Sequence, residues 1–494
     1  MAASYLLAID QGTSSTKTLL FDPAGQVVTR AVEPLTTHYF GESYVEQDPE
    51  GIYQNVLASV GQCLAAFTTA GGQLSEIAVA GISNQRETFV VWNAAGEPLH
   101  PAVVWQCKRS IDVCERLKAQ GLEAEVQAKT GLFLDPYFSG TKLLWLVENV
   151  PAVRTALAAG EAYFGTIDTW LLYRLTSGAQ YLTDYTNAAR TLFFNLHTLA
   201  WDADLLAAFG LTGLQLPALR PSAASFGEST FGGLFERPVP LGALIGDSHA
   251  AAFGEGCFAP GTAKATLGTG SSILMNIGGQ PRTSRHGMVT TICWSMAGRV
   301  DYALEGVIVT CGATVEWLKN SLGLFAESRD TEAMALAVPD NGGVYLVPAF
   351  SGLGAPHWQM ERRASITGLT FGTNKNHLVR AALESIPYQL QDVLLAMEQD
   401  TGLPLAELMV NGGLTANGFV LQLLADLLGK PVVSQLNPDV SAQGAAWLAG
   451  LQAGIYPDLA TLATLAAGRR IVSPGPGQAL AQAAYTGWQA ALGQ

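Results

Sequence analysis

The chain has 494 residues, of which 49% are apolar and only 14% are charged, so it carries ample material for large buried cores. A single hydrophobic core rarely grows beyond ~250–300 residues, and we therefore expect at least two domains. Lysine and arginine total 27 against 41 aspartate and glutamate, which gives a formal net charge of −14. This acidic balance argues against nucleic acid and anionic membrane surfaces as partners.

Cysteine usage and hydropathy indicate the compartment. The six cysteines are scattered, with no CxxC pair and no cysteine and histidine cluster at zinc spacing. The apolar run at the start of the chain has no basic region before it, and Asp10 interrupts it. No apolar stretch reaches the ~18–20 residues of a membrane helix. We therefore expect a soluble, cytoplasmic protein with reduced thiols and no membrane insertion.

The first half of the chain opens with strands. Strand-like runs at 4–10 and 17–21 are joined by QGTSST, and VVTRAV continues the meander. Asp48 followed by Pro49 is typical of a helix start, and the apolar spacing after it predicts a helix of about five turns. Further on, strand-like runs at 77–83 and 88–93 flank four polar residues, which we expect at the end of a sheet. Helical patterns fill roughly 107–175.

The same plan recurs near the middle of the chain. An apolar strand at 239–247 ends on Asp247 and is followed by small residues. Two strand-like runs, 263–267 and 272–277, are then joined by a glycine-rich turn. The repetition predicts two related α/β domains facing each other. Helices are expected at 375–399 and 417–428.

The first hairpin turn has the composition of a phosphate site. Asp10 ends a strand, hydroxyl residues fill the turn, and Lys17 follows. Backbone N–H groups and hydroxyls in such a turn can contact phosphate oxygens, while Lys17 supplies positive charge and Asp10 holds a magnesium ion. The spacing is not that of the Walker A loop. The alternative is an ordinary polar hairpin, but the second turn at 268–271 would allow two hairpins to grip a polyphosphate from both sides.

A third glycine-rich turn at 410–418 leads into a helix. Its paired glycines would let a flat ring lie against the backbone, with Asn417 as a hydrogen-bonding partner. The alternative is a strand-to-helix loop in which Asn417 is only a cap.

A second group of residues could bind a polar substrate. Arg86 and Glu87 adjoin between two apolar strands, where a solvated charge pair is the alternative. Trp105 and Tyr137 could equally be core aromatics. Asp247 is the best candidate for a catalytic base, because a carboxylate ending an apolar strand would be costly if it were buried and unpaired.

Taken together, these segments resemble the FGGY carbohydrate kinases, and within that family the members that phosphorylate glycerol. The resemblance covers nearly the whole chain and includes DQGT at 10–13, SNQRET at 83–88, YFSGTKLLWLVEN at 137–149, TDYTNAART at 183–191 and DYALEG at 301–306. It implies the actin-like ATPase fold, an α/β architecture of two ribonuclease H-like domains with an active-site cleft between them. We place the division at residues 1–253 and 254–494.

The resemblance also implies roles for individual residues. It suggests ATP-dependent transfer of a phosphoryl group to glycerol, giving sn-glycerol 3-phosphate, with Mg²⁺ and with Asp247 as general base. The implied substrate contacts are Arg86, Glu87, Trp105, Tyr137 and Asp247, with Ser248 and Ser272 at pocket positions. The implied nucleotide contacts are Thr13, Ser14, Ser15, Lys17, Thr269, Gly312, Glu316, Gly413 and Asn417, and the implied metal-associated carboxylates are Asp10 and Asp247. A homodimer or homotetramer is what the family implies.

The chain departs from the family at several of these positions. Ser248 stands where the family has Gln, and Ser272 where it usually has Phe. A serine in place of an aromatic ring predicts a larger, wetter pocket, and hence weaker glycerol binding or a somewhat larger polyol. Lys17 replaces Arg, Glu316 replaces Gln and Asn411 replaces Asp.

Two alternatives follow. One is a kinase of the same fold for a tetritol, a pentitol, dihydroxyacetone or xylulose, as Ser248 and Ser272 suggest. The other is an actin-like or chaperone-like ATPase, which would account for the phosphate hairpins but not for a second polar pocket.

Overall fold

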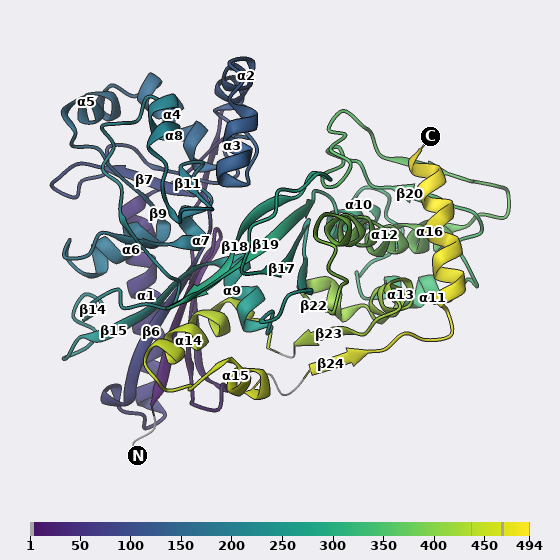
Figure 1. Ribbon diagram of the computed structural model, residues 1–494. Coiled ribbons are helices and arrows are strands. Elements are labelled where there is room, and N and C mark those ends of the chain that lie inside the picture. The colour runs from purple at the N-terminus through teal and green to yellow at the C-terminus, as the bar shows by residue number, and fades with distance from the viewer. Residues whose placement is uncertain (1–3, 436, 466–468, 494) are drawn as a thin grey trace.

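The computed structural model describes residues 4–435, 437–465 and 469–493, which form two lobes, each built around one large sheet (Figure 1). The C-terminal helix α16 (Gln478–Leu492) lies on the outer side of the second lobe. This arrangement confirms the predicted α/β architecture.

The first sheet has the strand order β14-β15-β6-β1-β2-β3. Three strands form the antiparallel meander predicted from the sequence, and β6 and β15 then run parallel to β1. The bounds are β1 Tyr5–Gln11, β2 Ser15–Phe21, β3 Val27–Pro34, β6 Ile77–Asn84, β14 Glu228–Ser229 and β15 Val239–Gly246.

The second sheet repeats this plan, in the order β18-β19-β17-β16-β22-β23-β24. Here β16, β17 and β19 form the antiparallel meander, and β22 and β23 run parallel to β16. The bounds are β16 Thr262–Leu267, β17 Ser271–Gly278, β18 Val289–Met296, β19 Arg299–Ile308, β22 Glu407–Asn411, β23 Val432–Gln435 and β24 Arg469–Val472. Apart from the edge strands β14, β18 and β24, the two sheets share one topology, so the predicted repetition of an actin-like, ribonuclease H-like unit is confirmed.

Side chains alternate between the two faces of each central strand. In β1, Leu7 and Ile9 pack with α1 (Pro49–Thr69) and α6 (Ile167–Leu175), whereas Leu6 and Ala8 pack on the opposite face with α14 (Val440–Gln452). The second sheet packs one face on α12 (Lys375–Thr401) and the other on α9 (Asp247–Gly254). Although α14 comes late in the chain, it therefore covers the sheet of the first lobe, as Figure 1 shows.

Smaller elements decorate both lobes. In the first lobe, a five-stranded sheet in the order β4-β5-β8-β7-β9 consists of β4 His38–Phe40, β5 Tyr44–Gln47, β7 Phe89–Trp92, β8 Ala102–Val103 and β9 Tyr163–Thr166. The helices near it are α2 Ile111–Ala119, α3 Glu123–Thr130, α4 Ser139–Asn149, α5 Pro151–Ala159 and α8 Ala203–Ala208, whereas α7 Tyr185–Ala188 contacts β15 and β18. The second lobe adds α10 Gly312–Asn320, α11 Asp330–Leu336, α13 Gly418–Leu428, β20 Tyr345–Val347 and β21 Ser365–Thr367. The helical region predicted at 107–175 is thus correct except that β9 interrupts it.

All six cysteines are buried and unbridged. None of the helices in the described residues has both the length and the apolar character needed to cross a membrane.

Helices α9 and α14 approach each other closely enough for their backbones to touch. A Cβ atom added at Gly444 would lie 1.9 Å from the carbonyl oxygen of Ala250, and one added at Gly254 would lie 2.2 Å from that of Val440. Only glycine permits such separations without displacement of a backbone. Because Asp247 is the first residue of α9, this contact determines where its carboxylate lies.

Gly444→Ala should therefore force the two helices apart. We expect a loss of about 2–4 kcal/mol in the free energy of unfolding, since the clash is with backbone rather than with a movable side chain. Chemical denaturation measures this loss. Gly372→Ala is the control, because its added Cβ would be 3.7 Å from the nearest atom. Equal stability of the two variants would contradict this account of the helix contact.

Candidate functional site

Asp247 lies at the carboxyl end of β15, where α9 begins. Its side chain is 38% exposed, and one carboxylate oxygen lies 3.4 Å from Nε of Arg86. The Ser248 backbone N–H donates to the same oxygen at 2.6 Å. The carboxylate avoids the cost of being buried and unpaired, because it is half-exposed and has a cationic neighbour. The group is accessible to a substrate while being held in one orientation.

Arg86 and Glu87 lie side by side in sequence but bind different partners. Arg86 donates from Nη1 and Nη2 to the two oxygens of Glu305, at 3.1 and 2.8 Å. Glu87 accepts from Nε of Arg190 at 2.5 Å. All four side chains are buried. The alternative of a solvated Arg86–Glu87 charge pair is therefore wrong.

Glu87 also has an unusual backbone conformation, with φ of 59°. A left-handed backbone conformation costs free energy in any residue other than glycine, and such strained residues are concentrated at functional sites. Here it turns Arg86 and Glu87 toward different neighbours at the end of β6.

Two aromatic side chains form a corner beside this charged group. The rings of Trp105 and Tyr137 meet edge to face, with centroids 5.6 Å apart. The Trp105 indole N–H donates to Oγ1 of Thr13 at 2.9 Å, and the Thr13 hydroxyl donates to Gln85 at 3.3 Å. Trp105 and Tyr137 are half-buried rather than enclosed in the core. The Thr13 hydroxyl therefore joins the first hairpin turn to the aromatic corner.

The first hairpin carries the predicted charges. Lys17 lies 3.1 Å from Asp439 and 3.9 Å from Asp10, and Asp439 also accepts from Arg30 at 2.7 Å. In the turn itself, Ser14 is exposed and Ser15 is half-buried. The turn thus presents hydroxyls and backbone beside a lysine whose charge is balanced by two carboxylates.

The surroundings of Asp10 make its negative charge costly, so they would favour a bound cation. Burial raises its pKa from the ordinary value of 3.8 to about 6, Lys17 opposes that rise, and the negative charge of Asp247 adds to it. The two carboxylates are thus close enough to repel each other, and oxygen donors of this kind suit Mg²⁺, which commonly binds one or two carboxylates together with substrate phosphates. Within the described residues no group of three or more His, Cys, Asp or Glu forms a metal site made by protein alone. The residues present fit a magnesium ion shared with phosphates.

Three loops of the second lobe converge around the second hairpin. The N–H of Gly312 donates to the carbonyl of Gly268 at 2.9 Å, and that of Cys311 donates to the carbonyl of Thr269 at 2.9 Å. A Cβ at Gly412 would lie 2.5 Å from the carbonyl oxygen of Leu267. The predicted nucleotide residues Thr269, Gly312 and Gly413 are therefore brought together.

The adjoining surface has room for a flat group. A Cβ placed on Gly413 would meet no atom within 4 Å. Asn417 caps α13 through the backbone N–H of Val420 at 3.1 Å, and its amide donates to Thr331 at 3.2 Å, so its structural role as a cap is present. Glu316 lies one turn into α10, exposed, and accepts from Ser328 at 3.2 Å.

The positions that depart from the family pattern have specific partners. Ser272 donates to Oε1 of Glu305 at 3.1 Å, and Ser248 is half-buried beside Asp247. The Asn411 amide donates to the buried carboxylate of Glu255 at 3.1 Å. An aspartate at position 411 would place a second carboxylate beside that of Glu255, and the two would repel each other.

Sequence reasoning missed three residues at this site: Arg190, Glu305 and Asp439. Arg190 and Glu305 lie in TDYTNAART and DYALEG, which had been noted only as matching segments. Nothing in their spacing links them to Arg86 and Glu87, because the contacts join residues more than 100 positions apart.

Comparison with known proteins identifies the family. Residues 5–254 match the N-terminal domain of the FGGY family of carbohydrate kinases, and residues 263–453 match its C-terminal domain. The chain belongs to the FGGY family of carbohydrate kinases.

Individual relatives cover the whole chain. Glycerol kinase of Carboxydothermus hydrogenoformans is 46% identical over 493 residues, covering 100% of this chain and 98% of the relative. Glycerol kinase of Stenotrophomonas maltophilia is 44% identical over 495 residues, with the same coverage. The crystal structure of Plasmodium falciparum glycerol kinase with ADP superimposes with a TM-score of 0.93 at 32% identity, covering 99% of this chain and 98% of that one. These similarities favour the kinase interpretation over an actin-like or chaperone-like ATPase.

The raised pKa of Asp10 has a consequence for stability. Between its ordinary pKa of 3.8 and about 6, the folded protein binds a proton that the unfolded chain does not, so stability falls as pH rises through this range. Asp10→Asn removes this loss. Without nucleotide and metal, we expect a gain on the order of 1–3 kcal/mol at about pH 7.5 and little gain at about pH 4, measured by thermal unfolding. The exposed Asp112→Asn serves as control, and a lower melting temperature for Asp10→Asn at the higher pH would contradict the assignment.

Proposed function

We propose that the protein is an ATP-dependent glycerol kinase, which transfers the γ-phosphoryl group of ATP to a terminal hydroxyl of glycerol. The observation that carries the proposal is the accessible Asp247 carboxylate, which lies beside Arg86 at a polar, aromatic-walled site, with Asp10 and the first phosphate hairpin adjoining it. The full-length similarity to curated glycerol kinases supports glycerol as the acceptor.

The polyol would lie against the aromatic corner. Trp105 and Tyr137 offer faces for its C–H groups, while Arg86 donates to its hydroxyls and Glu87 accepts from them. Because Nε of Arg86 already faces Asp247 and its Nη atoms face Glu305, only a small part of its donor capacity is left for substrate. This limits the site to a few precisely placed hydroxyls.

Asp247 would orient the attacking hydroxyl and accept its proton as the oxygen–phosphorus bond forms in line with the departing ADP oxygen. Arg86 and the Ser248 N–H hold the carboxylate in place, so little reorganisation is needed when the proton moves.

The phosphates would lie between the two hairpins. Thr13, Ser14, Ser15 and Lys17 would contact them from the first lobe and Thr269 from the second, with Gly312, Glu316, Gly413 and Asn417 around the nucleoside. Asp10 and Asp247 would hold Mg²⁺, which when bound neutralises phosphate charge. Lys17 would exchange part of its pairing with Asp10 and Asp439 for phosphate oxygens.

Further proposals concern the whole molecule. We place the division between kinase domains at residues 1–253 and 254–494, and we expect a homodimer or homotetramer. The six buried, unbridged cysteines support a cytoplasmic setting.

Asp247→Asn tests the base. It keeps the side-chain shape but cannot take up the proton, so we expect kcat for glycerol phosphorylation to fall by about 10²- to 10⁴-fold. Coupled ADP release measures the rate, and calorimetric titration of ATP shows whether the nucleotide site is intact. A variant that keeps more than about a tenth of wild-type kcat would exclude Asp247 as the base.

Acceptor choice depends on Ser248 and Ser272. We expect kcat/KM to be highest for glycerol among glycerol, dihydroxyacetone, erythritol, threitol, xylitol and xylulose. Ser272→Phe should lower the KM for glycerol severalfold, because a ring restores apolar contact with the substrate carbons and Glu305 keeps both of its arginine partners when the Ser272 hydrogen bond is lost. Ser248→Gln serves as the companion variant. A longer polyol leading the series would show that the two serines redefine the substrate, and an unchanged or higher KM for Ser272→Phe would contradict the pocket account.

A further inference from the structure

Arg190 and Glu305 connect Arg86 and Glu87, two charged groups of the proposed polyol site. Arg190 donates from Nε to Glu87 at 2.5 Å and from Nη1 to Glu305 at 2.6 Å. Glu305 in turn accepts from both Nη atoms of Arg86, at 3.1 and 2.8 Å. The chain Glu87–Arg190–Glu305–Arg86 contains two positive and two negative charges, so it is neutral as a whole.

None of these four side chains has access to bulk water. Arg190 and Glu87 are each 1% exposed, Glu305 is 2% exposed and Arg86 is 6% exposed. Buried charges of this kind are tolerated only when every one is paired. The mutual attraction lowers the pKa of Glu305 far below its ordinary value despite burial, with Arg190 and Arg86 as the main opposing charges. Burial raises the pKa of Glu87, and the charges of Arg190 and Arg86 oppose that rise. The ionised form of each carboxylate in the network therefore depends on the two arginines.

The residues of this network come from different parts of the fold. Glu305 lies on β19 of the second sheet, whereas Arg86 follows β6 of the first sheet and Arg190 follows α7. The guanidinium of Arg190 also lies 5.7 Å from the centroid of the Tyr137 ring and 5.0 Å from that of Phe138. Arg190 thus contacts Glu87 and one wall of the aromatic corner, and Glu305 holds Arg86 from the other lobe.

We propose that Arg190 and Glu305 are positioning residues for the acceptor: they contact the groups that bind the polyol and fix Arg86, Glu87 and Tyr137 in the geometry that glycerol needs. This inference rests on the proposed function. Ser272 extends the network, because its hydroxyl donates to the same Glu305 oxygen that accepts from Nη2 of Arg86. Polyol binding in the first lobe is thereby tied to a strand of the second.

The test uses Glu305→Gln, which keeps the shape of the side chain and removes its charge. The variant leaves Arg190 paired with Glu87 and Arg86 with Asp247 alone. Arg86 should therefore shift, and we expect the KM for glycerol to rise at least tenfold while the KM for ATP changes less than threefold. Glu305→Asp, which keeps the charge, should recover part of the loss. A merely structural role would move the two KM values together.

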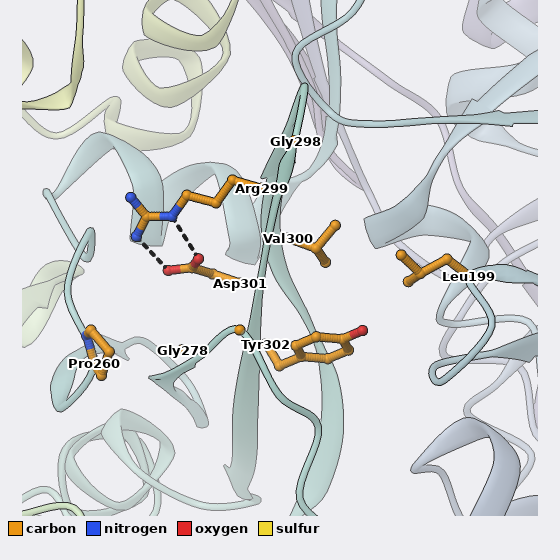
Figure 2. A pocket seen from close by; sticks show the side chains of 9 residues that line it. Leu199, Pro260, Gly278, Gly298, Arg299, Val300, Asp301 and Tyr302 are labelled. Carbon is orange, nitrogen blue, oxygen red and sulfur yellow. Dashed lines mark hydrogen bonds and ion pairs between the residues drawn. The ribbon is translucent and has the colours of Figure 1, made fainter.

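The matched control is Asp301→Asn. Asp301 lies on the same strand, is 2% exposed and pairs with Arg299 through contacts of 2.8 and 2.9 Å, so it is also a buried carboxylate in an ion pair (Figure 2). Figure 2 shows that pair in a recess near Pro260 and Gly278, and none of the proposed polyol contacts lines this recess. Asp301→Asn should leave both KM values within threefold of wild type.

The double variant Arg190→Gln with Glu305→Gln restores charge balance and guards against a single variant that fails to fold. Because Glu87 and Arg86 then balance each other, its glycerol KM should rise less than the product of the two single effects. Multiplicative effects, or a glycerol KM for Glu305→Gln within threefold of wild type, would overturn the inference. A wild-type enzyme that turns over no polyol at all would instead overturn the proposed function, and the positioning role with it.

Discussion

The close packing of α9 on α14 is the contact on which the rest of the site depends. Each helix covers one of the two sheets, and they can meet only because Gly254 and Gly444 have no side chain. The first residue of α9 is Asp247, and Asp439, which balances Lys17, immediately precedes α14. The Ser441 hydroxyl of α14 also donates to the carbonyl of Asp247 at 3.1 Å. One helix pair therefore sets the relative position of the proposed base and the phosphate hairpin.

Charged residues are few in this chain, and four of them are buried together at the candidate site. Only 14% of residues are charged, yet Arg86, Glu87, Arg190 and Glu305 are all buried at one place. Burial without partners would cost several kcal/mol per ion, so each must be neutralised by the others. Asp10 differs from these four, because burial raises its pKa to about 6 although Lys17 lies 3.9 Å away. The charged form of Asp10 is therefore costly to the fold.

Much of the fold could be predicted from local patterns in the sequence. The strands of both meanders, the helix start at Asp48 and Pro49, and the long helix at 375–399 lie close to where the periodicity predicted them. The crossing of α14 to the first sheet could not be predicted, because its apolar surface identifies a buried helix but not the sheet that buries it.

The residues of the candidate site likewise divide into those that the sequence could identify and those that it could not. Residues on strand ends and turns, such as Asp10, Arg86 and Asp247, could be found because local sequence places them at a sheet edge. Arg190 and Glu305 could not, since their importance comes from pairs formed across the fold. Likewise, the sequence did not reveal that Trp105 and Thr13 are hydrogen-bonded, which depends on how the small sheet lies over the first hairpin.

The open face of Gly413 has an implication for nucleotide choice. Unlike Gly444, this residue has no neighbour that a methyl group would strike, so the fold itself does not require glycine there. In the proposed nucleotide site, any selection for glycine would come from the bound base rather than from the protein. Discrimination among nucleoside triphosphates could therefore be redesigned by varying the size of the side chain at position 413, largely independently of folding.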